Sequence, residues 1–182
     1  EDYQKFVKML AFSDIWFHNF KEKNTRAILC YDWKLRSLPN YFQQLEMESL
    51  GKRPSKNSEF KKTGQIIFGG YGPTAQHSYF QLLHQGTQNI CADIILNKEN
   101  EYNGLAYSQG ITQARLLSEG AKTLLKDEET INGNVPVNLF IFDGIDAKKL
   151  GFLIATWEYR VFITSVMLQI NPFDQFGVNA GK

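Results

Sequence analysis

Apolar residues along this chain alternate between helical spacing and short continuous runs. In the first twenty residues the apolar side chains recur at helical spacing, which predicts an amphipathic helix; they are Phe6, Met9, Leu10, Ile15, Trp16 and Phe20. The segment TRAILCY at 25–31 is short, apolar and rich in β-formers, so it predicts a buried strand. Helical spacing returns in 35–53, where Pro39 fits a first helical turn after Ser37 or Leu38.

The same alternation continues to the end of the chain. Further strands are expected at 63–71, 89–96 and 135–142, and further helices at 74–86, 102–119 and 146–170. The basic stretch 51–62 is a loop candidate. Asn171 and Pro172 fit the N-cap and first residue of one more helix.

This order of elements predicts the fold class. Strands that alternate with helices and read as continuous apolar runs are typical of a parallel sheet covered on both faces. We therefore expect an α/β fold, a three-layer α/β/α sandwich with a mainly parallel sheet and right-handed crossovers, in one domain over 1–182. Ligands of such sheets bind beyond the carboxyl ends of the strands, which directs attention to the segments that follow them.

Composition narrows the class of protein. With 182 residues, 43% of them hydrophobic and a net charge of +1, the chain has ordinary globular values that give no sign of a nucleic-acid partner. No apolar run is long enough for a membrane span, and the first residues lack the pattern of a signal peptide. Cys30 and Cys91 lie in apolar runs without metal or redox spacing, which favours buried free thiols and a cytoplasmic location.

One short motif suggests a dinucleotide site, but two of its features disfavour that interpretation. The segment GYGPTA at 70–75 fits G-x-G-x-x-A between a strand and a helix. However, Pro73 removes an amide donor, and Asp93 lies inside the next apolar run rather than at its end. A helix start that faces a sugar or an anion is therefore favoured over a nicotinamide site.

Three pairs of polar residues could carry chemistry. Gln44 and Glu48 are four apart on one helix face, although an exposed surface glutamate is the simpler reading. His77 follows the glycine turn and is placed for acid–base work, whereas His84 is best read as a packed histidine, and no third ligand suggests a metal. If the last segment is helical, Gln175 and Lys182 share a face; an ordinary C-terminal helix explains them equally well.

Three segments together resemble one family. The segments QQLEMESLGK (43–52), GPTAQHSYFQLLHQGT (72–87) and FDQFGVNAGK (173–182), in this order and at these distances, are similar to the C-terminal part of the glucose-6-phosphate isomerase (phosphoglucose isomerase) family. The connecting text from 103–120 and 133–159 follows the same order. The resemblance implies the sugar isomerase (SIS) fold, which agrees with the α/β class expected above.

The resemblance also implies roles for the polar residues. Glu48 matches the base that moves a proton between C1 and C2 of the open-chain sugar phosphate, and His77 matches the histidine that assists ring opening in the neighbouring subunit's site of a homodimer. Lys182 matches the lysine near the ring and carbonyl oxygens, and Gln44 and Gln175 match substrate-contacting glutamines. Interconversion of glucose 6-phosphate and fructose 6-phosphate, in glycolysis and gluconeogenesis, is thus implied, with no metal or redox cofactor.

The chain departs from the family pattern in several places. Where the family usually reads G-T-N-G-Q-H and M-E-S-N-G-K, this chain has GPTAQH at 72–77 and MESLGK at 47–52, and Asn179 replaces a usual acidic residue. The family's other half, with its phosphate loop and an arginine that stabilises the enediolate, has no counterpart in 1–182. We therefore expect the C-terminal half of a longer two-domain isomerase, inactive alone. A non-catalytic sugar-phosphate-binding module, or the isomerase part of a transaldolase fusion, remains the alternative.

Overall fold

The computed structural model describes residues 1–99, 104–121 and 126–182, and strands and helices alternate along them. The strands are β1 (Thr25–Tyr31), β2 (Ile66–Tyr71), β3 (Ile90–Asn97) and β4 (Val137–Phe142). The longer helices are α1 (Asp2–Ile15), α2 (Leu38–Leu50), α5 (Leu105–Glu119) and α6 (Ala147–Leu168). The shorter helical segments are η1 (Trp16–Phe20), η2 (Trp33–Leu35), α3 (Gly72–Ala75), α4 (Phe80–Gln85), η3 (Asp127–Glu129) and α7 (Phe176–Ala180).

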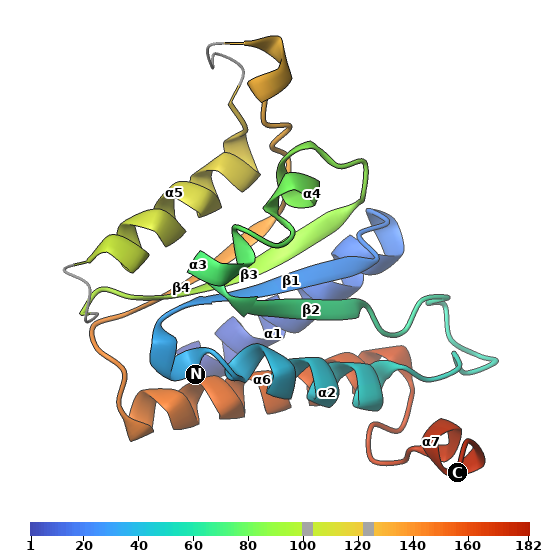
Figure 1. Ribbon diagram of the computed structural model, residues 1–182. Helices are drawn as coiled ribbons and strands as arrows, with labels where there is room; N and C mark the ends of the chain where they lie inside the picture. Colours follow the sequence, from blue (N-terminus) through green and yellow to red (C-terminus); the bar gives the residue numbers. More distant parts are fainter. Residues whose placement is uncertain (100–103, 122–125) are drawn as a thin grey trace.

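The four strands form one parallel sheet in the order β2-β1-β3-β4. Helices α1, α2 and α6 cover one face of this sheet, and α3, α4 and α5 cover the other (Figure 1). Every residue of β3 is buried, as expected for a central strand with helices on both sides. The predicted three-layer α/β class with a mainly parallel sheet is therefore confirmed.

Each face of the sheet has its own apolar core, and the two cores use alternate residues of the central strands. On the α1/α2/α6 side the core includes Ile28, Phe42, Ile95, Phe140 and Trp157. On the other side it includes Leu29, Tyr31, Ile94, Leu96 and Leu117. The period of two along each strand places successive side chains on opposite faces, and this explains the continuous apolar runs in the sequence.

Two glycines allow the helices on the α5 side to approach Tyr31 closely. A Cβ atom on Gly72 would lie 2.4 Å from the Tyr31 ring, and one on Gly110 would lie 2.9 Å from it. Because real Cβ atoms do not come this near, any larger residue would push α3 or α5 away from the sheet. In the GYGPTA motif, Gly72 is thus used for packing against an aromatic ring.

Two local predictions were wrong. The helix expected at 74–86 is interrupted, because Tyr79 leaves the helical conformation with φ −135° and packs its ring on Phe68, 5.3 Å away. The helix expected from Asn171 begins only at Phe176, as α7, since the Asn171 side chain accepts a hydrogen bond from the Phe173 backbone at 3.0 Å and forms a local turn. For the helix expected from Tyr102, that first residue lies outside the described residues, and α5 begins at Leu105.

Both cysteines lie inside the protein. Cys30 and Cys91 are both free and buried, as predicted. Burial raises the pKa of both thiols, that of Cys91 to about 11. Among the described residues, none of the helices is both long and apolar enough to cross a bilayer.

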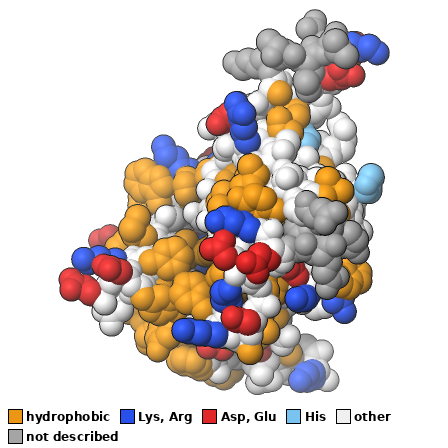
Figure 2. Space-filling view, turned by 90° about the vertical axis from the view of Figure 1, so that its left-hand side faces the viewer, with side chains coloured by type: hydrophobic (Ala, Val, Ile, Leu, Met, Phe, Trp, Pro, Cys, Tyr) orange, Lys and Arg blue, Asp and Glu red, His pale blue; other side chains and the backbone are white. Residues whose placement is uncertain are grey.

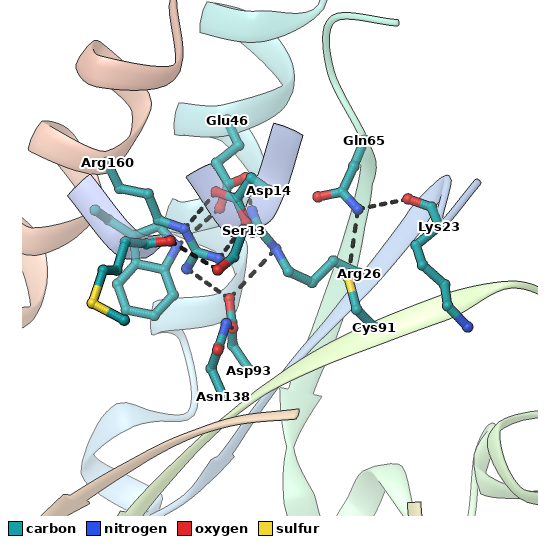
Figure 3. A network of polar contacts seen from close by, with 12 residues as sticks. Ser13, Asp14, Lys23, Arg26, Glu46, Gln65, Cys91, Asp93, Asn138 and Arg160 are labelled. Atoms are coloured by element: carbon teal, nitrogen blue, oxygen red, sulfur yellow. Dashed lines mark hydrogen bonds and ion pairs between the residues drawn. The ribbon is translucent and has the colours of Figure 1, made fainter. Parts of the chain in front are cut away.

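A buried ionic network joins the α1, α2 and α6 layer to the sheet (Figure 3). Arg160 of α6 donates to both carboxylate oxygens of Asp14 at 2.6 Å and to Asp93 of β3 at 2.8 Å. Arg26 of β1 contacts Asp14, Glu46 and Asp93. Burial alone would raise the pKa of Asp93, but the guanidinium groups of Arg160 and Arg26 outweigh it and hold that pKa below its ordinary value.

His18 lies beside this network and makes stability depend on pH. Burial, followed by the charges of Lys62 and Arg26, lowers the pKa of His18 from 6.5 to about 4. Between these pH values the unfolded chain binds a proton that the folded chain does not, so the free energy of unfolding falls as the pH falls from 6.5 to 4. We expect a loss of about 2 kcal/mol over this range, measured by urea denaturation.

The variant His18→Gln removes this titration and should flatten the same part of the pH profile. Any slope that remains then belongs to other groups, among them His84, whose pKa is also lowered by burial, and the carboxyl groups. If the variant keeps the slope of the parent protein between pH 6.5 and 4, His18 is not its source.

Candidate functional site

Glu48 is held near the C-terminal end of α2, and local sequence explains its placement. Ser37 precedes the helix, Pro39 lies in its first turn, and Gly51 follows its last residue. Phe42 and Leu50 face the core, so Glu48 is exposed on another side of the helix. Gln44, one turn earlier, lies 3.5 Å from the Glu48 carboxylate. The pairing expected from their spacing is confirmed.

A hollow of about 820 Å³ lies next to Glu48. One wall is formed by the end of α2 and the loop after it, through Met47, Glu48, Gly51, Lys52, Arg53 and Ser55. The other wall is formed by the segment 169–180, including Asn171, Asp174, Gln175 and Phe176. Glu48 and Gln175, far apart in sequence, are thus brought to one hollow, which has the size of a small-molecule site.

An ion pair fixes one wall of the hollow against the other. The Lys52 ammonium lies 3.2 Å from the Asp174 carboxylate and also donates to the Asp174 backbone oxygen. Both side chains are mostly buried. The Lys52 carbonyl in turn accepts from the Thr63 hydroxyl at 2.6 Å, which holds the loop after α2. These bonds fix the position of Gln175, which directly follows Asp174.

The last segment is only partly as predicted. Helix α7 covers Phe176–Ala180, so Gln175 is its N-cap residue and Lys182 lies beyond its end. The two residues therefore do not share a helical face as expected for a continuous helix. Lys182 is exposed and does not line the hollow, whose last lining residue is Ala180.

His77 and Glu48 lie at opposite ends of β2 and on opposite faces of the sheet. Helix α2 ends beside Gly64, just before β2, whereas the His77 turn follows α3 at the far end of that strand. A strand of this length spans about 20 Å. His77 is exposed, and its backbone N–H donates to Thr74 at 3.1 Å. These two residues cannot act on one small molecule within a single copy of the chain.

His84 has a structural role, as predicted. His84 is half-buried, bonds Gln113 at 2.9 Å and meets the Phe80 ring edge-on at 5.3 Å. Burial lowers the pKa of His84. Asp93, considered above with the dinucleotide motif, is fully buried and paired with Arg160, so it cannot bind a dinucleotide.

Sequence reasoning missed the cations around the hollow. Lys52 and Arg53 both line it, and the sequence predicted no role for either side chain at the site. Their position directly after Glu48 in MESLGKR was the available signal. Lys52 is paired with Asp174, whereas Arg53 suits an anionic ligand, because its guanidinium can bind phosphate or carboxylate oxygens through two N–H groups.

The fold and this hollow define a class of protein: a parallel α/β domain with a helix carboxylate, a glutamine and cations around a small-molecule site. Comparisons with known proteins identify the family within this class. The sequence model of the family described as phosphoglucose isomerase matches residues 3–182. A glucose-6-phosphate isomerase of Acinetobacter venetianus is 37% identical over 98% of this chain and 37% of its own length. Another from Acinetobacter baumannii is 39% identical over 96% of this chain and 36% of its own.

Solved structures agree with this result. A glucose-6-phosphate isomerase from Chlamydia trachomatis superposes with a TM-score of 0.84 at 28% identity, covering 96% of this chain and 36% of that one. A hypothetical protein from Thermus thermophilus has the same fold, with a TM-score of 0.75 at 19% identity over 93% of this chain and 42% of its own. The chain belongs to the phosphoglucose isomerase family, and it spans little more than a third of the length of the curated relatives it matches.

Proposed function

We propose that this chain is the C-terminal half of a two-domain, cytoplasmic isomerase that interconverts glucose 6-phosphate and fructose 6-phosphate. The observation that carries the proposal is the hollow in which Glu48 and Gln175 meet, in a chain that matches this family over 3–182. Relatives named glucose-6-phosphate isomerase support the substrate class.

In this proposal Glu48 is the base. It takes the proton from C2 of the open-chain aldose, leaving a cis-enediolate, and returns it to C1 on the same face of the sugar, so that one carboxylate serves both steps. The carbon acid is weak, so donors must stabilise the developing oxyanion. Gln44, beside Glu48, and Gln175, across the hollow, are assigned to substrate hydroxyl groups. The reaction requires no redox cofactor.

We assign His77 to ring opening in the site of a second subunit. The position of His77 at the far end of β2 from Glu48 supports this assignment, because a complete site then needs two copies of the chain. Lys182 is assigned to the ring and carbonyl oxygens, a role that requires the segment after Ala180 to turn toward the hollow when substrate binds. His77→Asn should therefore lower turnover of ring-closed substrate more than turnover of the open-chain form.

A coupled assay for glucose 6-phosphate formation from fructose 6-phosphate tests the proposal. The full-length protein that contains this chain should turn over, while residues 1–182 alone should retain less than about 1% of that rate, because remote binding groups are missing. A full-length protein that binds the sugar phosphate without turnover is instead a non-catalytic binding module. Comparable rates from the chain alone would show that the site is misplaced.

A further inference from the structure

Segment 171–182, which carries Gln175, is held to the rest of the domain mainly by Lys52. Its helix α7 has no buried residue and Phe173 is 82% exposed, so apolar packing holds the segment only weakly. Within the part of the chain that the structure describes, the hydrogen bonds that join this segment to other elements all come from the Lys52 ammonium. They end on the carboxylate and the backbone oxygen of Asp174. Lys52 is therefore the main anchor of the segment.

The ion pair of Lys52 and Asp174 is more sheltered than the other lysine ion pairs that the structure describes. Figure 2 shows acidic and basic side chains mixed on the face at the carboxyl ends of the strands, where the side chains of Lys98 and Asp143 are 50% and 73% exposed. Those of Lys52 and Asp174, at the end of the domain where α7 lies (Figure 1), are 15% and 24% exposed. Water screens an exposed pair, whereas a sheltered pair with a second bond to the backbone holds its partners in one geometry.

Lys52 is itself fixed relative to Glu48, which lies four residues earlier. Helix α2 ends at Leu50, whose backbone oxygen accepts from the Lys52 backbone N–H at 2.7 Å. The Thr63 hydroxyl donates to the Lys52 backbone oxygen at 2.6 Å. One short segment thus carries both the candidate base and the cation that holds the opposite wall of the hollow.

The Lys52 ammonium is directed at the protein and not at a ligand. Two of its three N–H groups are used by Asp174, whose carboxylate also balances its charge. Gln175 directly follows Asp174 and is the N-cap residue of α7. An effect of Lys52 on a reaction in the hollow must therefore pass through Gln175.

We propose that Lys52 is a positioning residue, which contributes to the rate of isomerisation by holding Gln175 across the hollow from Glu48. This inference rests on the proposed function, in which Gln175 contacts a substrate hydroxyl group. A displacement of about 1 Å in a site can cost about 100-fold in rate. Without the Lys52 ammonium, segment 171–182 keeps its covalent connection to α6 but loses the bonds that place Gln175.

Hydrogen exchange tests the holding of Gln175 without any need for activity. In the full-length protein, Lys52→Met keeps an apolar stem but removes the charge and the donors. The backbone N–H groups of Val178 and Asn179 donate to the Gln175 oxygen at 2.9 and 3.1 Å. They should exchange about 5-fold faster or more in the variant, measured by mass spectrometry of the peptide that contains them, while exchange in α2 stays unchanged.

Lys56→Met is the matched control, because Lys56 is exposed in the same loop and does not line the hollow. It should leave both exchange and turnover at the values of the parent protein. Asp174→Ala removes the other member of the pair and should also speed the exchange, so the test does not depend on the folding of one variant.

Kinetics separate positioning from a direct role of Lys52. Lys52→Met and Gln175→Ala should each lower kcat/KM for fructose 6-phosphate by about 10- to 100-fold. The double variant should be no slower than Gln175→Ala alone, because Lys52 then has nothing left to position. Effects that multiply overturn the proposal, since a group that binds substrate or only stabilises the fold adds its own cost.

Unchanged exchange in Lys52→Met overturns the proposal as well, and it does so while an active full-length protein leaves the proposed function standing. The converse result is also distinguishable. Faster exchange in a full-length protein without isomerase activity supports the holding of Gln175 by Lys52, while the proposed function fails.

Discussion

Replacing Glu48 by glutamine in the full-length protein should abolish exchange of the sugar C2 proton with solvent while substrate affinity stays nearly unchanged. The glutamine keeps the size of the side chain and its contact with Gln44, but it cannot take a proton from carbon. General-base groups typically contribute about 100- to 10,000-fold to rate, so kcat should fall by about 1,000-fold or more. Exchange is measured by NMR in deuterium oxide, and affinity by calorimetry with fructose 6-phosphate.

Glu59→Gln provides the control for this experiment. Glu59 is also exposed and lies in the loop that follows α2, so its replacement removes the same charge from the same region without touching the hollow. Exchange should continue at the rate of the parent protein. If Glu48→Gln retains exchange, another group is the base; if it loses affinity in parallel with rate, Glu48 acts in binding the ground state.

The fold was predictable because strands and helices have different patterns of apolar residues in the sequence. The four strands of the structure overlap the apolar runs that predicted them, with ends that differ by at most a few residues. Buried parallel strands must be apolar on both faces, and this pattern is local. The interrupted helix at 74–86 could not be read in this way, since the packing of Tyr79 on Phe68 depends on β2.

Only the part of the candidate site that is built from residues close in sequence was predictable. Gln44 and Glu48 are one helical turn apart, so spacing alone places them together. The hollow depends on Lys52 and Asp174, which are 122 positions apart, and no spacing rule reaches across that distance. The rule that ligands bind beyond the carboxyl ends of strands also does not lead to this hollow. Glu48 ends a crossover helix that runs back toward the amino ends of the strands, close to the start of β2.

The buried ionic network shows why a polar residue inside an apolar run carries information. Asp93 interrupts the run of β3, and the structure pairs it with Arg160 and Arg26 and with Asn138 at 2.7 Å. Two guanidinium groups face three carboxyl groups here, and burial raises the pKa of the third, Glu46. Glu46 also accepts from Trp157 at 2.9 Å. The network thus ties three helices to three strands, and its charged members depend on one another for charge balance.

Replacing Arg160 by methionine should cause a large loss of stability. Arg160 is 1% exposed, and its removal leaves Asp14 and Asp93 with too little positive charge in a site that excludes water. Breaking a buried ion pair in this way costs about 3–5 kcal/mol, which in a chain of this size lowers Tm by about 10 °C. Arg115→Met breaks an exposed pair with Glu119 instead, and it should cost less than about 1 kcal/mol.

A double substitution separates the effect of charge from that of packing. Arg160 also packs over the Trp157 ring, 5.2 Å from its centre, so Arg160→Met removes packing as well as charge. Asp93→Asn in the Arg160→Met background removes one carboxylate that has lost the nearer of its two guanidinium partners, while the asparagine oxygen can still accept from Asn138. If uncompensated charge is the main cost, the double variant should be clearly more stable than the sum of the two single losses predicts. Additive losses, measured by urea denaturation, would assign the effect of Arg160→Met to packing alone.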